Sequence, residues 1–276
     1  MIGFASDEGV RRNKGRVGAR SAPDAIRKHL AKLPYNINEM KTTDYGNIIC
    51  EGDQLEKAQH ELGEKVTELL HCHQTPIILG GGHETLYGHY LGVREFLKRD
   101  KTIGIINIDA HFDLRKEEVP SSGTMFRQIL ENDAAAGYMC LGIQSFGNTG
   151  SLFQAADYFG CHYVLEEEIQ SNTMQHTFRK MDDFAKKYDC IMMTLCMDSI
   201  ISSAAPGVSA PSPFGLDPKM VRSLLNYIAA KENTISFDIS EVNPELDEND
   251  KTVRLAAYLT AETMNSFSLK GRKQLK

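Results

Sequence analysis

The chain has 276 residues, of which 41% are hydrophobic and 25% are charged, and its formal net charge is −6 at pH 7. This composition is that of a globular protein with a sizeable core, and the acidic balance argues against a general binder of nucleic acids or membrane surfaces. No apolar run reaches the roughly 18 residues of a membrane span, and the first residues lack the features of a secretory signal. Six dispersed cysteines without a C-x-x-C pair are typical of reduced thiols, so we expect a cytoplasmic protein.

Hydrophobic periodicity and turn residues predict strands that alternate with helices along the chain. In the N-terminal part we expect a short strand over Met1–Ala5, a Gly- and Arg-rich loop over 9–20, a helix over Pro23–Leu33 capped by Ser21, a helix over Leu55–Cys72, a strand over Pro76–Leu79 and a helix over Thr85–Arg99. An apolar, β-branched strand then begins at Thr102 and suits a sheet that is buried on both faces.

The same alternation continues to the end of the chain. We expect a helix over about Met125–Glu131, a strand over Tyr138–Ile143, a short helix around Leu152–Tyr158, a strand over His162–Leu165, a helix over Gln175–Lys187, a strand over Cys190–Met197, a helix over Asp217–Lys231, a strand over Thr234–Ile239 and a helix over Thr252–Ser268. No repeat or long linker divides the chain. We therefore predict a single α/β domain over 1–276, with a mainly parallel sheet built from right-handed βαβ units.

The strand that begins at Thr102 ends in three potential metal ligands, Asp109, His111 and Asp113. If the extended backbone continues past Ile108, these alternate residues project on one side, at the end of the strand where open α/β sheets bind ligands. Two carboxylates and an imidazole form a mixed oxygen and nitrogen set that suits Mn²⁺ or Zn²⁺. The alternative is an ordinary polar loop after a strand.

Other predicted strands also end in polar residues of matching chemistry, namely His83, Asp198, Asp238 and Glu241. Because the carboxyl ends of parallel strands share one edge of the sheet, these side chains can converge. Each has a simpler alternative: glycines 80–82 can cradle a phosphate or let the backbone turn to present His83, and Asp238 and Glu241 can cap the turn that follows. The phosphate loop is the weaker of these, because the known glycine fingerprints are incomplete here.

The chain resembles the arginase-like ureohydrolase family over nearly its whole length. Gly81-Gly82-His83-Glu84 resembles the family's G-G-D-H-S segment, Asp109–Asp113 its D-A-H-x-D segment and Asp238–Pro244 its D-I-x-E-V-N-P segment. The resemblance implies a three-layer α/β/α fold around a mainly parallel, about eight-stranded sheet, with a dinuclear Mn²⁺ site. The implied metal ligands are His83, Asp109, His111, Asp113, Asp198 and Cys196.

Within this family the chain is most similar to the formimidoylglutamase branch, through residues 9–13, 122–128, 144–149 and 205–211. Arginases carry a histidine where this sequence has Phe126, which counts against guanidino substrates of the arginase type. The resemblance implies hydrolysis of N-formimidoyl-L-glutamate to L-glutamate and formamide, a step of histidine degradation, through hydroxide that the metal centre supplies. It implies a small-molecule substrate, no nucleic-acid or membrane partner, and leaves a homo-oligomer open.

The sequence departs from the family at one metal position. The family's third metal segment reads S-x-D-x-D, and this chain has Thr194-Leu195-Cys196-Met197-Asp198 there, so that Cys196 replaces the first, bridging aspartate. A thiolate is a softer ligand that favours Zn²⁺ or Fe²⁺ over Mn²⁺, whereas a protonated thiol leaves one metal under-coordinated. Either two metals bind, one of them weakly, or the site is effectively mononuclear.

The resemblance also implies roles around the metal, with Asp113 as the proton carrier and Glu241 as the acceptor that aligns the amidine. The substrate has two carboxylates, which bidentate arginine recognises well. The candidate substrate-binding residues are Arg12, Ser122, Thr124, Arg127 and Glu241, while Arg11, Arg16 and Arg20 are equally available by composition. The alternatives are pairing of these arginines with surface acids, an agmatinase- or guanidinobutyrase-like ureohydrolase, and a catalytically silent ligand-binding protein.

Overall fold

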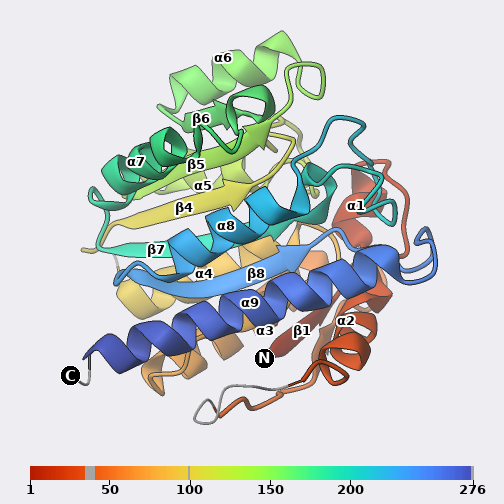
Figure 1. The fold of residues 1–276 in the computed structure, drawn as a ribbon. Coiled ribbons are helices and arrows are strands. Elements are labelled where there is room, and N and C mark those ends of the chain that lie inside the picture. The colour runs from red at the N-terminus through yellow and green to blue at the C-terminus, as the bar shows by residue number, and fades with distance from the viewer. Residues whose placement is uncertain (35–40, 99, 275–276) are drawn as a thin grey trace.

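The computed structural model describes residues 1–34, 41–98 and 100–274 and is built around one eight-stranded sheet (Figure 1). Every neighbouring pair of strands is parallel, in the order β2-β1-β3-β8-β7-β4-β5-β6. The strands are β1 (Ile2–Ala5), β2 (Asn47–Ile49), β3 (Ile77–Leu79), β4 (Ile103–Ile108), β5 (Ala136–Ile143), β6 (His162–Leu165), β7 (Cys190–Cys196) and β8 (Thr234–Ser240). The predicted parallel α/β architecture is confirmed.

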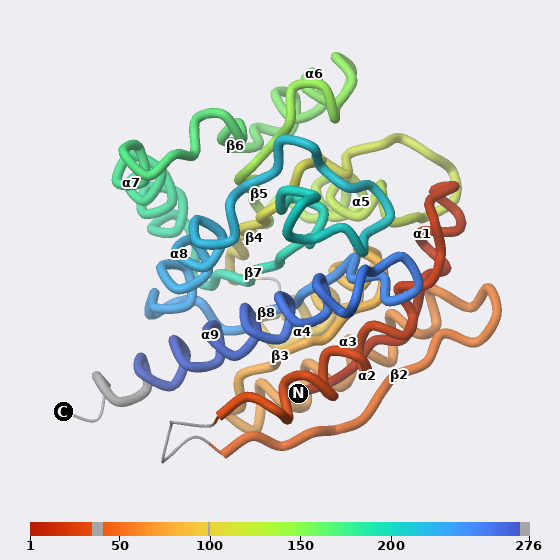
Figure 2. The backbone as a smooth tube through the Cα atoms, turned by 45° about the vertical axis from the view of Figure 1, so that its right-hand side comes forward, coloured from red at the N-terminus to blue at the C-terminus, as the bar shows by residue number. Residues whose placement is uncertain are grey.

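Helices cover both faces of the sheet, which gives the three layers expected from the family resemblance. The helices are α1 (Glu8–Arg12), α2 (Ala22–Leu30), α3 (Leu55–His71), α4 (Thr85–Leu97), α5 (Met125–Asn132), α6 (Gly150–Tyr158), α7 (Met174–Ala185), α8 (Pro218–Ala229) and α9 (Lys251–Gln274). Helices α2, α7, α8 and α9 pack with one face of the sheet, and α3, α4, α5 and α6 pack with the other, as Figures 1 and 2 show from two directions.

The two hydrophobic cores follow from the alternation of side chains along the strands. In β3, Ile77 and Leu79 belong to the core under α2 and α9, whereas Ile78 belongs to the core under α3 and α4. In β4, Ile105 and Ile106 divide between the cores in the same way. Because both faces are covered, these strands consist of apolar residues rather than of an apolar and polar alternation.

Helix α3 shows how the sequence pattern determines which side of a helix is buried. Its buried apolar residues recur at every third or fourth position and include Leu55, Ala58, Leu62, Val66 and Leu69. This spacing places them in one stripe along the helix. The buried Gln59 beside the stripe donates to the carbonyl oxygen of Glu84. A helix of this kind obtains most of its stability from the packing of that stripe.

Two local predictions were wrong, and one strand was not predicted. Residues 9–20 are not entirely a loop, because α1 spans Glu8–Arg12 and buries Val10. Strand β2, three half-exposed residues at the edge of the sheet, carried too short an apolar pattern to be recognised. Ser21 does not cap α2, since its hydroxyl donates instead to the carbonyl oxygen of Gly18 at 2.9 Å. The other elements were found with shifted ends, and the predicted end of one helix at Arg99 lies outside the described residues.

The parallel arrangement brings the carboxyl ends of four adjacent strands to one edge of the sheet. In the sheet these strands follow one another in the order β3-β8-β7-β4. The predicted metal ligands all lie at or just after the ends of β3, β4 and β7. Glu241 directly follows β8. Across the described residues, no helix has the length and hydropathy needed to cross a membrane.

Candidate metal centre

The segment that follows β4 converges on the site by a route different from the one we predicted. The extended backbone stops at Ile108, and residues 109–113 form an irregular loop in which Asp113 has a left-handed φ of 51°. The side chains of Asp109, His111 and Asp113 therefore do not share one side of a strand. They are brought together by the bend, which Asn148 holds by accepting from the Phe112 amide at 3.0 Å.

His83 is presented by a close contact between two backbone segments. A Cβ atom at Gly81 would lie 1.8 Å from the carbonyl oxygen of Ser6, so only glycine allows β3 to continue past the end of β1 here. The neighbouring Gly82 amide donates to that same oxygen at 2.9 Å. The glycines thus serve close backbone approach and the presentation of His83, rather than the cradling of a phosphate.

Two groups of ligand atoms meet around Asp109. In the first, His83 Nδ1 lies 3.0 Å from Asp109 Oδ2 and 3.0 Å from Asp113 Oδ2, and the ligand atoms of His83, Asp109 and Cys196 lie within 4.8 Å of one another. In the second, the ligand atoms of Asp109, His111 and Asp198 likewise lie within 4.8 Å of one another, and His111 Nδ1 lies 3.2 Å from Asp198 Oδ2. Asp109 belongs to both groups, so its carboxylate could contribute to holding an ion in each of them.

The chemistry of these groups fits divalent cations. One imidazole nitrogen has at most one proton, so His83 Nδ1 cannot donate well to two carboxylates, whereas a metal ion accepts lone pairs from all three groups. Asp198 Oδ1 is buried without a hydrogen-bond partner, although buried carboxylate oxygens are normally satisfied. Imidazole nitrogens and carboxylate oxygens bind Mn²⁺ and Zn²⁺ well.

Behind the first group runs a chain of buried hydrogen bonds. His83 Nε2 lies 3.3 Å from Thr194 Oγ1, and Thr194 donates to Asp238 Oδ1 at 2.7 Å. The other oxygen of Asp238 lies 2.7 Å from His89 Nδ1, and His89 Nε2 lies 2.6 Å from Ser236 Oγ. Asp238, expected at the shared edge, therefore lies one layer behind the ligands and orients them through Thr194. Sequence reasoning did not find His89, which has no motif to mark it.

Glu241 faces the same pocket and is oriented by His83, whose backbone amide donates to Glu241 Oε1 at 2.9 Å. Its backbone has a left-handed φ of 66°, so the side chain turns back toward the strand ends. Burial raises the pKa of Glu241 to about 8, and the charges of Asp198 and Glu84 add to this effect. A cation bound beside it favours the charged form.

Five of the six ligands, all but Asp109, line a cavity of about 110 Å³, and the structure adds a cationic side chain, a receptor for anions, that sequence reasoning missed. Arg115, Asn13 and Ser122 line the cavity together with His111 and Asp198. Arg115 Nη1 donates to Asn13 Oδ1 at 2.8 Å, and Asn13 Nδ2 donates to Ser122 Oγ at 3.2 Å. The guanidinium thus has a neutral partner and remains available for an anion. Of the predicted substrate-binding residues, Ser122 and Glu241 lie here.

The other three predicted substrate-binding residues do not line this cavity. Arg12 is held by the carboxylates of Glu8 and Glu56, so that it joins α1 to α3. Arg127 pairs with Glu131 at 2.8 Å on the outer side of α5. Thr124 is buried and accepts from the amide of Ser121 at 2.9 Å, which fixes the start of the same helix. All three therefore have structural partners, which for the arginines are distant in sequence or on the same or next helical turn, and their role in substrate binding stays a prediction.

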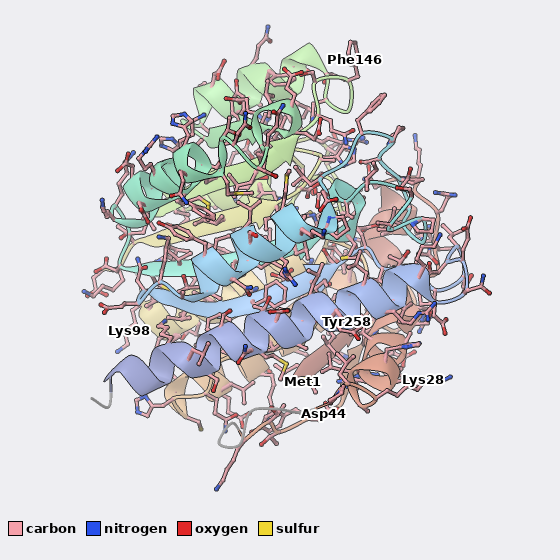
Figure 3. All side chains as sticks on the ribbon, in the orientation of Figure 1. Met1, Lys28, Asp44, Lys98, Phe146 and Tyr258 are labelled. Atoms are coloured by element: carbon pink, nitrogen blue, oxygen red, sulfur yellow. The ribbon has the colours of Figure 1, made fainter. Side chains whose placement is uncertain are left out.

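The rim of the cavity includes the loop after β5, in which Gly147 and Asn148 contribute to the lining. Asn148 also donates to the carbonyl oxygens of Ala110 and Gln144, both at 2.9 Å. The neighbouring Phe146 projects from the surface, as Figure 3 shows. In the buried layer behind His83, Phe126 stacks on Tyr138 with 3.9 Å between ring centroids and forms an edge-to-face pair with His83. An apolar ring therefore stands beside the first group of ligands.

Comparison with known proteins gives matches over almost the whole chain. The Arginase family model matches residues 1–265. The chain is 56% identical to a formimidoylglutamase of Geobacillus sp. (strain WCH70) over 275 residues, which are 99% of this chain and 84% of that protein. It is 43% identical over 278 residues to a formimidoylglutamase of Clostridium tetani (strain Massachusetts / E88), with 97% of this chain and 82% of that protein covered.

Solved structures agree with these matches. The formimidoylglutamase from Bacillus subtilis subsp. subtilis str. 168 aligns with a TM-score of 0.89 and 27% identity, over 97% of this chain and 86% of that chain. Trypanosoma cruzi formiminoglutamase with Mn²⁺₂ aligns with a TM-score of 0.87 and 27% identity, over 97% of this chain and 92% of that chain.

Proposed function

Because the chain belongs to the arginase family, we propose that it hydrolyses N-formimidoyl-L-glutamate to L-glutamate and formamide. The observation that carries this proposal is that one cavity joins the two groups of metal ligands to an arginine with a neutral partner. Relatives over 40% identical, which carry the name formimidoylglutamase, support the same substrate. The six unpaired cysteines support a reducing cytoplasm as its location.

His83, Asp109, His111, Asp113, Asp198 and Cys196 would hold two divalent ions, for which Mn²⁺ is the ion of the Trypanosoma cruzi structure. When bound, such ions make a water molecule acidic enough to act as a nucleophile near neutral pH. The protein's own contribution is to fix the ligands. Asn107 Nδ2 donates to Asp109 Oδ2 at 3.1 Å and the His111 amide donates to Asp109 Oδ1 at 2.8 Å, so both oxygens of that carboxylate are oriented.

Asp113 and Glu241 are the two acids placed for proton transfer and alignment. Burial raises the pKa of Asp113, and its Oδ2 faces His83, so it is suited to carry a proton from the attacking water to the departing glutamate nitrogen. Glu241, whose Oε1 is fixed by the His83 amide, is suited to accept hydrogen bonds from the amidine N–H groups. Cleavage of the bond between carbon and the glutamate nitrogen then releases formamide.

Arg115 is the best-placed receptor for the carboxylates of the substrate. A guanidinium binds a carboxylate through two parallel hydrogen bonds, and Asn13 and Ser122 add an amide and a hydroxyl beside it. Phe126 occupies the place where arginases have a histidine and puts a buried apolar ring against His83 instead. Both features favour an amidine attached to a dicarboxylic acid over a cationic guanidino amino acid.

The test is release of glutamate from N-formimidoyl-L-glutamate by protein stripped of metal and then reloaded with Mn²⁺ or Zn²⁺. Arginine, agmatine and guanidino acids are assayed beside it with the same preparations. We expect turnover of N-formimidoyl-L-glutamate alone, and only after metal is restored. Turnover of a guanidino compound in its place would assign a different ureohydrolase. If the metal-loaded protein turned over none of these substrates, the result would favour a ligand-binding protein without catalytic activity.

A further inference from the structure

Cys196 ends β7 in a position that turns its side chain into the metal cavity. The residue is 2% exposed, lines the cavity, and has extended backbone angles of φ −88° and ψ 120°. A single 3₁₀ turn over Met197–Ser199 follows and brings Asp198 into the same cavity. The hydroxyl of Ser199 donates to the Cys196 carbonyl oxygen at 2.7 Å and fixes this turn. Cys196 and Asp198 are thereby held as a pair.

A second observation points to bound cations at the two groups to which Cys196 and Asp198 belong. Asp198 Oδ1 is buried and has no hydrogen-bond partner, while its Oδ2 lies 3.2 Å from His111 Nδ1. In the group that contains the sulfur, the ligand atoms of His83, Asp109 and Cys196 lie within 4.8 Å of one another. An unpartnered buried carboxylate oxygen is explained by a cation in the Asp109–His111–Asp198 group, which shares Asp109 with the group that contains Cys196.

The charges around the sulfur also favour a cation over an empty thiol. Asp109 has a ligand atom within 4.8 Å of the Cys196 sulfur, Asp198 and Glu241 line the same cavity, and all three acids are buried. Buried like charges at close range are unfavourable unless a positive group lies among them. Without a cation, burial and these acids raise the pKa of the Cys196 thiol, whereas a cation bound among them favours the thiolate.

Another buried cysteine shows by contrast what a structural thiol looks like here. Cys140, on the neighbouring part of the sheet, donates to the carbonyl oxygens of Asp109 and His111, both at 3.7 Å. It is not among the residues that line the cavity. Its sulfur therefore has backbone partners, whereas Cys196 presents its sulfur to imidazole and carboxylate groups.

We propose that Cys196 binds the metal as a thiolate, so that the His83–Asp109–Cys196 half of the centre selects a thiophilic divalent ion such as Zn²⁺ over Mn²⁺. The Asp109–His111–Asp198 half keeps a nitrogen and oxygen set that suits harder ions. One nitrogen, one sulfur and one carboxylate oxygen, with Asp113 Oδ2 3.0 Å from His83, provide the four-coordinate set that Zn²⁺ commonly adopts. The inference rests on the proposed function only for the location of the metal site.

The experiment uses the whole protein and needs no substrate. Metal-stripped protein is titrated anaerobically with Co²⁺, and thiolate-to-cobalt charge transfer is followed in the near ultraviolet. We expect this band in the wild type and in Cys190→Ala, a control at the opposite, buried end of β7, and its loss in Cys196→Ser. Stoichiometric Co²⁺ binding without the band in the wild type would overturn the proposal.

A second measurement avoids dependence on any variant. X-ray absorption of Zn²⁺-loaded wild-type protein reports a sulfur neighbour at about 2.3 Å if the thiolate is bound, and only nitrogen and oxygen neighbours would refute the inference. In competition experiments, Cys196→Asp should lower the preference for Zn²⁺ over Mn²⁺ by about tenfold or more. An unchanged ratio would count equally against the role of Cys196. Because these readouts concern binding, they separate failure of this inference from failure of the proposed reaction.

Discussion

His89 Nδ1 lies 2.7 Å from Asp238 Oδ2, and the pair is buried at the junction of α4 and β8. Through Thr194 this pair reaches the imidazole of His83 on the side opposite to its carboxylate neighbours. Partners of this kind fix the orientation and tautomer of a metal-binding histidine. The buried pair therefore acts on the metal centre without touching it.

Replacement of Asp238 by Asn should weaken metal binding, because the chain of hydrogen bonds that orients His83 is broken at its centre. Loss of such a partner lowers metal affinity by about 10- to 100-fold. The dissociation constant is measured by metal-competition titration. Thr234→Ala, at the other end of β8, removes a buried hydrogen bond remote from the site and serves as the control. Equal metal affinities in both variants would show that the hydrogen bonds through Asp238 do not orient His83.

Replacement of Arg115 by Ala should raise KM for N-formimidoyl-L-glutamate. A charge-assisted hydrogen bond contributes about 1.5–3 kcal/mol, so the expected change is on the order of ten- to a hundredfold. Arg127→Ala is the matched control, since its pair with Glu131 on α5 is exposed on one side and contributes less than about 1 kcal/mol. Steady-state kinetics of the two variants decide which arginine recognises the carboxylates, and a larger effect at Arg127 would reverse our assignment.

Replacement of Arg12 by Ala should affect stability rather than substrate affinity. Its guanidinium bonds to Glu8, which is 6% exposed, and to the carbonyl oxygen of Pro120. Removing a partner from a buried carboxylate destabilises the fold by about 1–3 kcal/mol. Urea unfolding measures this loss, and kinetics on the folded fraction should give KM close to that of the wild type. A KM increase like that of Arg115→Ala would restore Arg12 as a substrate ligand.

The Glu8 carboxylate should also make stability depend on pH. Hydrogen bonds from Arg11, with Arg12 adding to them, hold the pKa of Glu8 below its ordinary value. An acid whose pKa is lowered on folding contributes stability above its unfolded pKa of about 4.5, and this contribution disappears as pH falls through the folded pKa. Between about pH 6 and about pH 3, Glu8→Gln should therefore lose less stability than the wild type. Parallel pH profiles would mean that Glu8 does not couple folding to protonation.

Removal of metal should lower thermal stability, because the ions would bind the folded protein and relieve repulsion among Asp109, Asp113 and Asp198. A ligand at 100 times its dissociation constant stabilises a fold by about 2.7 kcal/mol. Calorimetry before and after treatment with a chelator measures this effect, and added Mn²⁺ or Zn²⁺ should restore the original transition. A transition that stays at the same temperature throughout would argue against metal binding at this cluster.

The sequence was enough to predict a mainly parallel sheet, the alternation of strands and helices, and the convergence of the strand ends. Buried β-branched runs and turn residues are local signals that can be recognised in one sequence. The path by which Asp109, His111 and Asp113 converge was not predictable in this way. It depends on the left-handed backbone of Asp113 and on Asn148, which approaches from the loop after β5. Long-range contacts of this kind leave no periodic pattern in the chain.

The arginines illustrate the same limit. Arg12 and Arg127 were favoured as substrate ligands because they lie within segments that resemble the formimidoylglutamase branch, but Glu8, Glu56 and Glu131 neutralise them. Arg115 lies two positions past Asp113, and this proximity to the metal motif was the available signal. Proximity to a converging motif therefore indicated which arginine lines the cavity, and arginine content did not.

The most direct test of the central claim is identification of the products by proton NMR. Metal-loaded protein is incubated with N-formimidoyl-L-glutamate, and the products are followed over time, with Glu241→Gln as a variant that keeps the shape of the site. We predict equimolar formamide and L-glutamate, with a turnover rate lowered by about 100-fold or more in Glu241→Gln. Formation of N-formyl-L-glutamate and ammonia, or of no product while the metal is bound, would contradict the account.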